Sequence, residues 1–113
     1  MIIDTKLENF KIRFAERKDV PLILEFIKEL AAYEKLSDQV AATEEILTDS
    51  LFERKTAEVV FGEYEGKAVA FAIFFHNFSS FVGKPGIYLE DLYVKPEMRG
   101  LGIGKTILSF LAK

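Results

Sequence analysis

A glycine-rich turn constrains this sequence more than any other feature. Residues 99–105 read Arg-Gly-Leu-Gly-Ile-Gly-Lys, between an aromatic, β-branched run that ends at Pro96 and an amphipathic run over residues 103–112. The first run predicts a strand and the second a helix. The first N–H groups of a helix have no partner within it, and its dipole makes that end electropositive. The stretch therefore predicts an anion-binding turn, to which Arg99 can add a charge-assisted contact.

Spacing separates three phosphate-binding patterns that compete for this turn. A P-loop ends in Gly-Lys-Ser/Thr, as Gly104, Lys105 and Thr106 do, but its first glycine would fall where the chain has Arg99. The dinucleotide fingerprint would need a glycine at position 105 or 107, where lysine and isoleucine stand. The pattern Arg/Gln-x-x-Gly-x-Gly/Ala is met by Arg99, Gly102 and Gly104. The turn thus resembles the pyrophosphate-binding signature of the GCN5-related N-acetyltransferase (GNAT) family, the alternative being a glycine-rich turn before a core helix.

Composition narrows the classes of protein further. A chain of 113 residues, half of them apolar and 29% charged, has room for one folded domain. The net charge of −3 argues against nucleic acid as a partner and suits a cationic substrate. The chain has no cysteine and a single histidine, His76, so it offers no disulfide, thiolate or multi-histidine metal site. No signal peptide or membrane-spanning run is evident, so we expect a cytoplasmic protein without a metal.

Periodicity predicts the elements of the first half of the chain. Residues 11–14 alternate as a strand does. Apolar residues then recur at helical spacing over residues 20–33, with Pro21 in the first turn, where its missing N–H does no harm. Thr43, followed by two glutamates, predicts the N-cap of a short second helix that extends to Leu51.

The second half of the chain predicts most of a sheet. The β-rich runs 57–64 and 67–75 flank Glu65-Gly66, which predicts a tight hairpin with positive φ at the glycine. Residues 77–86 read as a loop, with His76 beside it as a loop histidine. Residues 87–94 are apolar on both faces and predict a central strand. This order predicts an α/β or α+β domain, with one sheet flanked by helices.

Other stretches resemble one branch of the GNAT family, the diamine (spermidine/spermine) N-acetyltransferases. These stretches are residues 29–34, Gln39-Val40, Thr43-Glu44 and residues 86–94, which include Tyr88-Leu-Glu-Asp91. The match runs in register along the whole chain. It implies an acyl-CoA N-acyltransferase-like fold with a mixed, mostly antiparallel sheet, and acetyl transfer from acetyl-CoA to a primary amine of a small polyamine or diamine. Relatives that acetylate thialysine or other small amines are an alternative.

The resemblance also implies what lies outside these residues. The family's fold continues with another strand, a helix bearing a tyrosine that acts as general acid, and further strands, whereas this sequence stops at Lys113. We therefore expect residues 1–113 to be one GNAT domain that lacks the C-terminal part of the fold, and a homodimer as its assembly. A non-catalytic CoA-binding or dimerisation fragment remains the alternative from another class.

Three carboxylates are candidates for handling the amine. An alkyl amine with a pKa of about 10.4 is protonated at neutral pH and must lose a proton before it attacks. Glu90 is the predicted general base, because a carboxylate in an apolar strand should have a raised pKa, and the resemblance implies the same role. Asp91 would face the opposite side of a regular strand, but a β-bulge would re-aim both side chains. Asp91 and Glu34 are the weaker candidates for binding the cationic amine.

The predicted cofactor site joins the strand to the turn. The resemblance implies that the main chain of residues 92–94 hydrogen-bonds the pantetheine arm like an added strand, with one N–H at the thioester oxygen. Tyr88 and Tyr93 are expected to pack rather than to act as acids. In the turn, glycines can adopt positive φ and let a ligand approach the backbone. The predicted acetyl-CoA-binding residues are Leu92, Tyr93, Val94, Arg99, Gly100, Leu101, Gly102, Ile103, Gly104 and Lys105.

Overall fold

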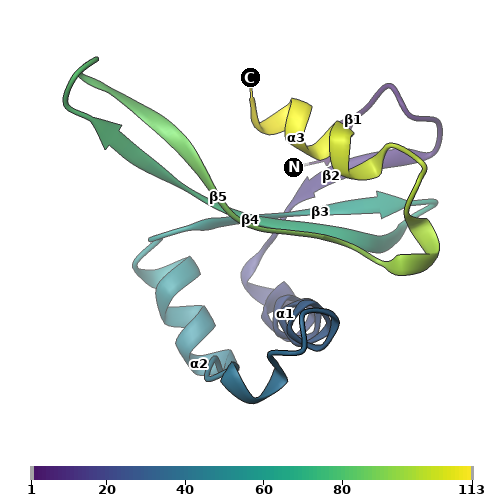
Figure 1. Cartoon of the computed structure of the whole chain (residues 1–113), viewed down its shortest axis with the longest axis horizontal. Coiled ribbons are helices and arrows are strands. Elements are labelled where there is room, and N and C mark those ends of the chain that lie inside the picture. Colours follow the sequence, from purple (N-terminus) through teal and green to yellow (C-terminus); the bar gives the residue numbers. More distant parts are fainter. Residues whose placement is uncertain (1, 113) are drawn as a thin grey trace.

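The computed structural model of the protein describes residues 2–112. Its centre is a five-stranded sheet in which the strands follow one another in chain order and every neighbouring pair is antiparallel (Figure 1). The strands are β1 (Ile2–Asp4), β2 (Phe10–Phe14), β3 (Glu58–Tyr64), β4 (Lys67–Ser79) and β5 (Lys84–Val94). The α-helices are α1 (Val20–Tyr33), α2 (Glu44–Leu47) and α3 (Ile103–Leu111).

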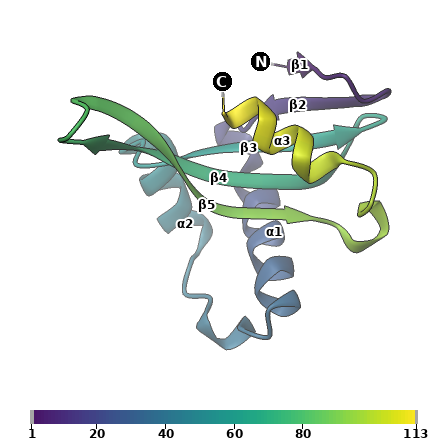
Figure 2. The same cartoon turned by 45° about the horizontal axis from the view of Figure 1, so that its top comes forward.

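Helices cover both faces of the sheet, with α3 on one face and α1 and α2 on the other (Figure 2). Because successive residues of a strand point to opposite faces, the strands contribute to two separate apolar clusters. The α3-side cluster contains Phe10, Ile12, Val60, Val69, Ala70, Ala72, Phe74, Ile103, Ile107 and Leu111. The α1-side cluster contains Val20, Ile23, Phe26, Leu47, Val59, Phe61, Phe71, Ile73 and Tyr93.

The helices begin and end close to the positions that the sequence predicts. Helix α1 spans Val20–Tyr33 with Pro21 in its first turn, which confirms the predicted bounds. Thr43 caps α2, because its Oγ1 accepts a hydrogen bond from the Ile46 N–H at 3.2 Å. Helical turns continue over Thr48–Glu53, so the predicted second helix extends to Leu51 and beyond as one bent segment.

The start of α1 is tied to the sheet by a compact ion cluster. The Arg13 guanidinium contacts the two carboxylate oxygens of Asp19 at 2.7 and 3.2 Å, and its Nε donates to Glu63 at 2.9 Å. Asp19 also accepts a hydrogen bond from the Glu16 N–H at 2.7 Å. Asp19 directly precedes α1, so this cluster fixes the helix against β2 and β3.

The hairpin between β3 and β4 is confirmed, whereas the loop predicted at residues 77–86 is wrong. Glu65 and Gly66 both have positive φ, at 51° and 81°, as a tight turn requires. Strands β4 and β5, however, stay paired as far as Ser79 and Lys84. Pro85 does not stop this pairing, because a proline is tolerated on an edge strand. His76 therefore lies within β4, with its Nδ1 at 3.5 Å from Glu58, and is not a loop histidine.

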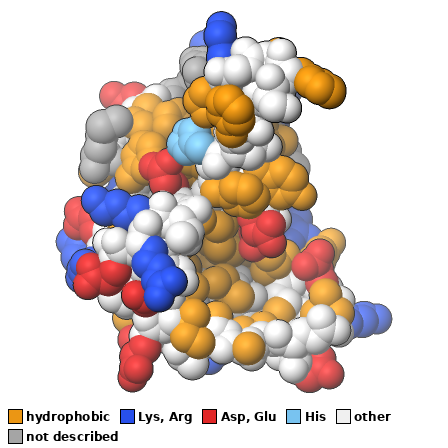
Figure 3. All heavy atoms as spheres, turned by 90° about the vertical axis from the view of Figure 1, so that its left-hand side faces the viewer, with side chains coloured by type: hydrophobic (Ala, Val, Ile, Leu, Met, Phe, Trp, Pro, Cys, Tyr) orange, Lys and Arg blue, Asp and Glu red, His pale blue; other side chains and the backbone are white. Residues whose placement is uncertain are grey.

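The paired ends of β4 and β5 project from the body of the protein as a long arm. Figure 3 shows hydrophobic side chains gathered on this arm, with a hollow below it. The most exposed large apolar residues of the arm are Phe78, Phe81 and Val82, of which Phe81 is fully accessible. Packing within residues 2–112 therefore does not explain why these three positions carry apolar side chains.

The prediction that residues 87–94 form a central strand is also wrong. Among residues 2–112, β5 pairs with β4 alone and lies at the edge of the sheet. Its apolar pattern has another cause: Leu92 packs into the α3-side cluster and Tyr93 into the α1-side cluster. A strand that is apolar on both faces needs other elements packed against both faces. This pattern does not indicate whether one or both of its edges pair with another strand.

Candidate functional site

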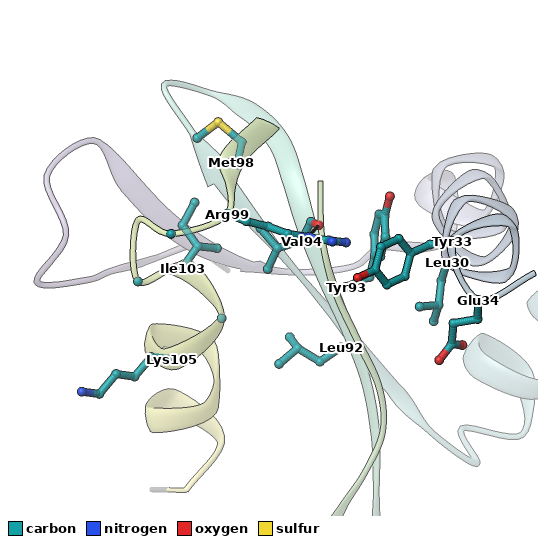
Figure 4. Close-up of a pocket in the computed structure, with 13 residues that line it drawn as sticks. Leu30, Tyr33, Glu34, Leu92, Tyr93, Val94, Met98, Arg99, Ile103 and Lys105 are labelled. Atoms are coloured by element: carbon teal, nitrogen blue, oxygen red, sulfur yellow. Dashed lines mark hydrogen bonds between the residues drawn. The ribbon is translucent and has the colours of Figure 1, made fainter. Parts of the chain in front are cut away.

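A cavity of about 560 Å³ lies between the end of α1, strand β5 and the turn that precedes α3 (Figure 4). It brings together three segments that are far apart in the sequence, including the glycine turn and residues 92–94. Its lining consists of Leu30, Tyr33, Glu34, Leu92, Tyr93, Val94, Met98, Arg99, Gly100, Gly102, Ile103, Gly104 and Lys105. Leu101, Glu90 and Asp91 do not line it.

Two of the three glycines in the turn have the backbone conformation that calls for glycine. Gly100 and Gly102 have φ values of 85° and 83°, and a Cβ at either position would meet nothing within 4 Å. Their requirement is therefore conformational and not spatial. Gly104 lies inside α3, where a Cβ would come 3.8 Å from Val94 Cγ2 and 3.9 Å from Leu92 Cδ2, which are ordinary contacts.

The N-terminus of α3 offers unpaired donors to the cavity. Gly102 is the N-cap residue, and the first intrahelical hydrogen bond runs from the Thr106 N–H to the Gly102 carbonyl at 3.0 Å. The N–H groups of the three residues before Thr106 therefore have no partner within the helix. With the helix dipole, these donors make the start of α3 electropositive, which is the feature on which the predicted anion site depends.

Alanine scanning of the turn separates the two kinds of glycine. We expect Gly104→Ala to raise the free energy of unfolding by about 0.5–1 kcal/mol, because alanine favours the helix and its Cβ fits. We expect Gly102→Ala to lower it by about 1 kcal/mol, because a Cβ strains a left-handed residue. Urea unfolding followed by circular dichroism measures both. Destabilisation by Gly104→Ala would show that α3 packs closer to β5 than the contacts indicate.

Arg99 extends across the cavity toward α1 (Figure 4). Its Nε donates to the Val94 carbonyl at 2.9 Å, and its guanidinium lies over the ring of Tyr33 at 4.2 Å and near that of Tyr93 at 5.5 Å. The side chain of Lys105, by contrast, points away from Tyr33 in the same view and is exposed. Sequence reasoning missed Tyr33, because nothing local to α1 indicates a partner on the turn.

Along one edge of β5, the main-chain N–H and C=O groups point away from β4. Lys95 donates its N–H to the Val69 carbonyl at 2.9 Å, so Lys95 faces β4. Because orientation alternates along an antiparallel strand, Tyr93 also faces β4, while Leu92 and Val94 face the open edge. The Arg99 contact with the Val94 carbonyl agrees with this orientation. The polar groups that could pair with an added chain are therefore those of Leu92 and Val94, and not those of Tyr93.

Strand β5 contains a β-bulge, a possibility that the sequence could not decide. Asp91 pairs with Ile73 and Leu89 with Phe74, so Glu90 is the extra residue. Leu89 and Leu92 consequently pack into the same α3-side cluster, although regular alternation would put them on opposite faces. The bulge thus re-aims the side chains at positions 90 and 91.

The side chain of Asp91 is partly buried, whereas that of Glu90 is exposed. The pKa of Asp91 is raised, first by burial and then by the negative charges of Glu90 and Glu34. Glu90 is exposed in the bulge of an edge strand, so the desolvation expected for it is wrong. Glu34 also lines the cavity. Asp91 is therefore near enough to Glu90 and Glu34 to be affected by their charges, but of the three only Glu34 lines the cavity.

Tyr93 packs as predicted. Its ring is buried and makes edge contacts with Phe26 and Tyr33, each at 6.3 Å between centroids. Burial, followed by the charge of Glu29, raises the pKa of the Tyr93 phenol, so it stays protonated at neutral pH. Glu29 in turn pairs with Lys95 at 3.2 Å, a link between α1 and the end of β5 that the sequence did not indicate.

Among residues 2–112, no group of histidine, aspartate and glutamate side chains is arranged to hold a metal ion. Within the same part of the chain, every helix is too short or too polar to cross a membrane.

Comparison with known sequences gives a family and several relatives. Residues 23–113 match the model of the acetyltransferase (GNAT) family. A thialysine N-epsilon-acetyltransferase from Sus scrofa is 42% identical over 111 residues, which cover 90% of this chain and 65% of that protein. The spermidine/spermine N(1)-acetyltransferase-like protein 1 of Homo sapiens is 37% identical, over 96% of this chain and 17% of that protein. The chain spans about two thirds of the length of the thialysine enzyme.

Comparison with solved structures agrees on the fold. The structure of a predicted acetyltransferase with acetyl-CoA from Clostridium acetobutylicum superposes with a TM-score of 0.74. It is 19% identical, and the match covers 90% of this chain and 70% of that one. At this level of identity the likeness concerns the arrangement of helices and strands.

Proposed function

Because the chain belongs to the acetyltransferase (GNAT) family, we propose that it transfers the acetyl group of acetyl-CoA to a primary amine of a small polyamine-like or diamine substrate. The observation that carries this proposal is the cavity, which joins an electropositive helix N-terminus to an open strand edge, with carboxylates next to it. An anionic cofactor and a cationic substrate would thus approach from opposite ends.

The residues of the cavity fit acetyl-CoA in two places. The free N–H groups at the start of α3 suit its pyrophosphate, because they combine hydrogen-bond donors with the positive end of a helix dipole. The outward main-chain groups of Leu92 and the Val94 N–H suit its amide-containing arm, which would pair with the edge like an added strand. Acetyl-CoA supplies the activated acetyl group, as a thioester.

The carboxylates fit a cationic amine. A protonated alkyl amine is attracted by the negative charges of Glu34, Glu90 and Asp91. Burial, and then the charges of Glu90 and Glu34, raise the pKa of Asp91. Glu90, exposed in the bulge next to Leu92, would accept the proton that the amine must lose before it attacks. Asp91 and Glu34 would hold the amine in place. Spermidine, putrescine, thialysine and lysine all present such an amine.

Calorimetric titration with acetyl-CoA and with ATP tests the cofactor site, with Gly102→Asp as the disruptive variant. We expect binding of acetyl-CoA and not of ATP, and a roughly tenfold or greater loss of affinity in Gly102→Asp, because a carboxylate would stand beside the phosphates. The matched control is Gly83→Asp, since Gly83 also has a positive φ, 68°, but lies in the turn between β4 and β5.

An acetylation screen over the four amines completes the test. Turnover of at least one of them supports the enzyme, whereas tight CoA binding without turnover favours a CoA-binding or dimerisation module. If the chain binds ATP better than acetyl-CoA, the proposal is wrong.

The assembly and location that we propose with this activity are a homodimer in the cytoplasm. Light scattering of the purified chain measures its mass in solution.

A further inference from the structure

The side chain of Arg99 is held at two points on opposite walls of the cavity. On the β5 side its Nε donates to the Val94 carbonyl at 2.9 Å, and on the α1 side its guanidinium lies 4.2 Å from the centre of the Tyr33 ring. Figure 4 shows Arg99 reaching from the turn toward Tyr33, past Val94. The turn before α3 is thereby connected to a helix that is distant in sequence.

The aromatic ring is the main partner of the guanidinium charge. Among residues 2–112, no carboxylate lies within salt-bridge distance of Arg99, and its two terminal nitrogens donate to no protein acceptor. A guanidinium that lies over an aromatic ring is attracted by the ring's negative face. Its N–H groups point outward in the guanidinium plane, so Nε can donate a hydrogen bond at the same time. Tyr33 is itself largely exposed, so its ring is not required to fill the core.

The turn has a particular need for such an anchor. Gly100 and Gly102 follow Arg99 directly, and glycines lose more conformational freedom on ordering than any other residue. The turn is fixed at its end by α3, while its start is held by the Arg99 side chain and by the Arg99 N–H, which donates to the Pro96 carbonyl at 3.3 Å. A turn that is already ordered binds its ligand more tightly, because less conformational entropy is lost on binding.

We propose that Tyr33 is a positioning residue for CoA: its ring holds Arg99 against Val94 and so keeps the glycine turn in the conformation that binds the cofactor. This inference rests on the proposed function and adds to it a residue outside the glycine motif. The ring and not the hydroxyl does this, since the contact that the structure shows joins the Arg99 guanidinium to the Tyr33 ring.

The test compares Tyr33→Phe, which keeps the ring, with Tyr33→Leu, which removes it. In the full chain, the Kd for CoA is measured by calorimetry, and KM and kcat by acetylation rates. We expect Tyr33→Leu to raise the Kd for CoA and the KM for acetyl-CoA by roughly threefold to tenfold, with kcat at saturation changed by less than about twofold. We expect Tyr33→Phe to restore binding to within about twofold of the wild type.

A double-mutant cycle with Arg99→Lys shows whether Tyr33 acts through Arg99. Lysine cannot both lie over the ring and donate from an Nε to Val94, so Tyr33→Leu should cost little further affinity in the Arg99→Lys background. Tyr88→Leu is the matched control, because Tyr88 is an exposed tyrosine of β5 that does not line the cavity.

The outcomes separate this inference from the function on which it rests. Unchanged CoA affinity in Tyr33→Leu, an equal loss in Tyr33→Phe, or full additivity with Arg99→Lys would each overturn the role of Tyr33 alone. A wild-type chain that binds no CoA would overturn the proposed function, and the role of Tyr33 with it.

Discussion

Replacing Glu90 by glutamine is expected to lower kcat by a factor of about 10²–10⁴, with little change in the KM for acetyl-CoA. Glutamine has nearly the same shape as glutamate but cannot accept the proton of an alkylammonium group. Glu90 lies in the bulge of β5, two residues before Leu92, whose main chain faces the open edge. Initial rates of acetylation against amine concentration, at saturating acetyl-CoA, measure the effect.

Two variants control this experiment. Glu45→Gln removes an exposed glutamate of α2 that does not line the cavity, and we expect rates within about twofold of the wild type for a surface substitution of this kind. Asp91→Asn distinguishes the neighbouring carboxylate, whose pKa is raised by burial. If Asp91→Asn abolishes turnover while Glu90→Gln does not, the proton acceptor is Asp91 and our assignment is wrong.

Local sequence patterns predict those elements whose cause is local. Helix α1 follows from helical periodicity and Pro21, the cap of α2 from the Thr43 hydroxyl, and the β3–β4 turn from Glu65-Gly66. The glycine motif likewise predicts the turn before α3, because left-handed residues and a helix N-terminus are both encoded within a few positions. The family assignment drawn from that motif is confirmed by the match over residues 23–113.

Features that depend on distant partners could not be predicted in this way. The apolar pattern of β5 indicates cover on both faces, but it cannot show that one edge has no partner strand among residues 2–112, since edge pairing is a property of main-chain groups. The pairing of β4 with β5 to Ser79 has the same origin. The stacking of Arg99 on Tyr33 joins side chains from the turn and from α1, and neither carries a signal of the other.

The candidate site shows the same division. The proposed cofactor end is encoded in one short motif, so nearly all of the predicted turn residues line the cavity. The proposed amine end depends on the bulge in β5 and on the end of α1, which together set the environments of Glu90 and Asp91. The sequence predicted burial for Glu90, but the structure buries Asp91 more, because a bulge changes the direction of the side chains at both positions.

Replacing Asp19 by asparagine is expected to lower the free energy of unfolding by about 3 kcal/mol at neutral pH, because it leaves the Arg13 guanidinium partly unpaired in a buried setting. The two side chains are only 10% and 17% exposed, and they meet at 2.7 Å. The cluster fixes the start of α1, the helix whose other end carries Tyr33 and Glu34, so activity should fall together with stability. Urea unfolding followed by circular dichroism measures the difference.

The pH dependence of stability gives this prediction a second readout. Burial acts to raise the pKa of Asp19, but hydrogen bonds from Arg13 and the Glu16 N–H outweigh it, so the folded pKa is lower than usual. An aspartate with a lowered folded pKa stabilises the fold above its unfolded value of about 3.9, and this stability is lost as pH falls through the folded pKa. The wild type should therefore lose this contribution in acid, and Asp19→Asn should lack that loss.

An exposed ion pair in the same protein supplies the control. Asp49 contacts Arg54 at 2.9 Å, but both side chains are more than half exposed, so Asp49→Asn should cost less than about 0.5 kcal/mol. The same chemical change thus has two expected magnitudes, set by burial and by the number of hydrogen bonds that the carboxylate accepts. If Asp19→Asn and Asp49→Asn prove equally mild at neutral pH, the Arg13 cluster does not secure α1, and the geometry of the cavity must depend on apolar packing instead.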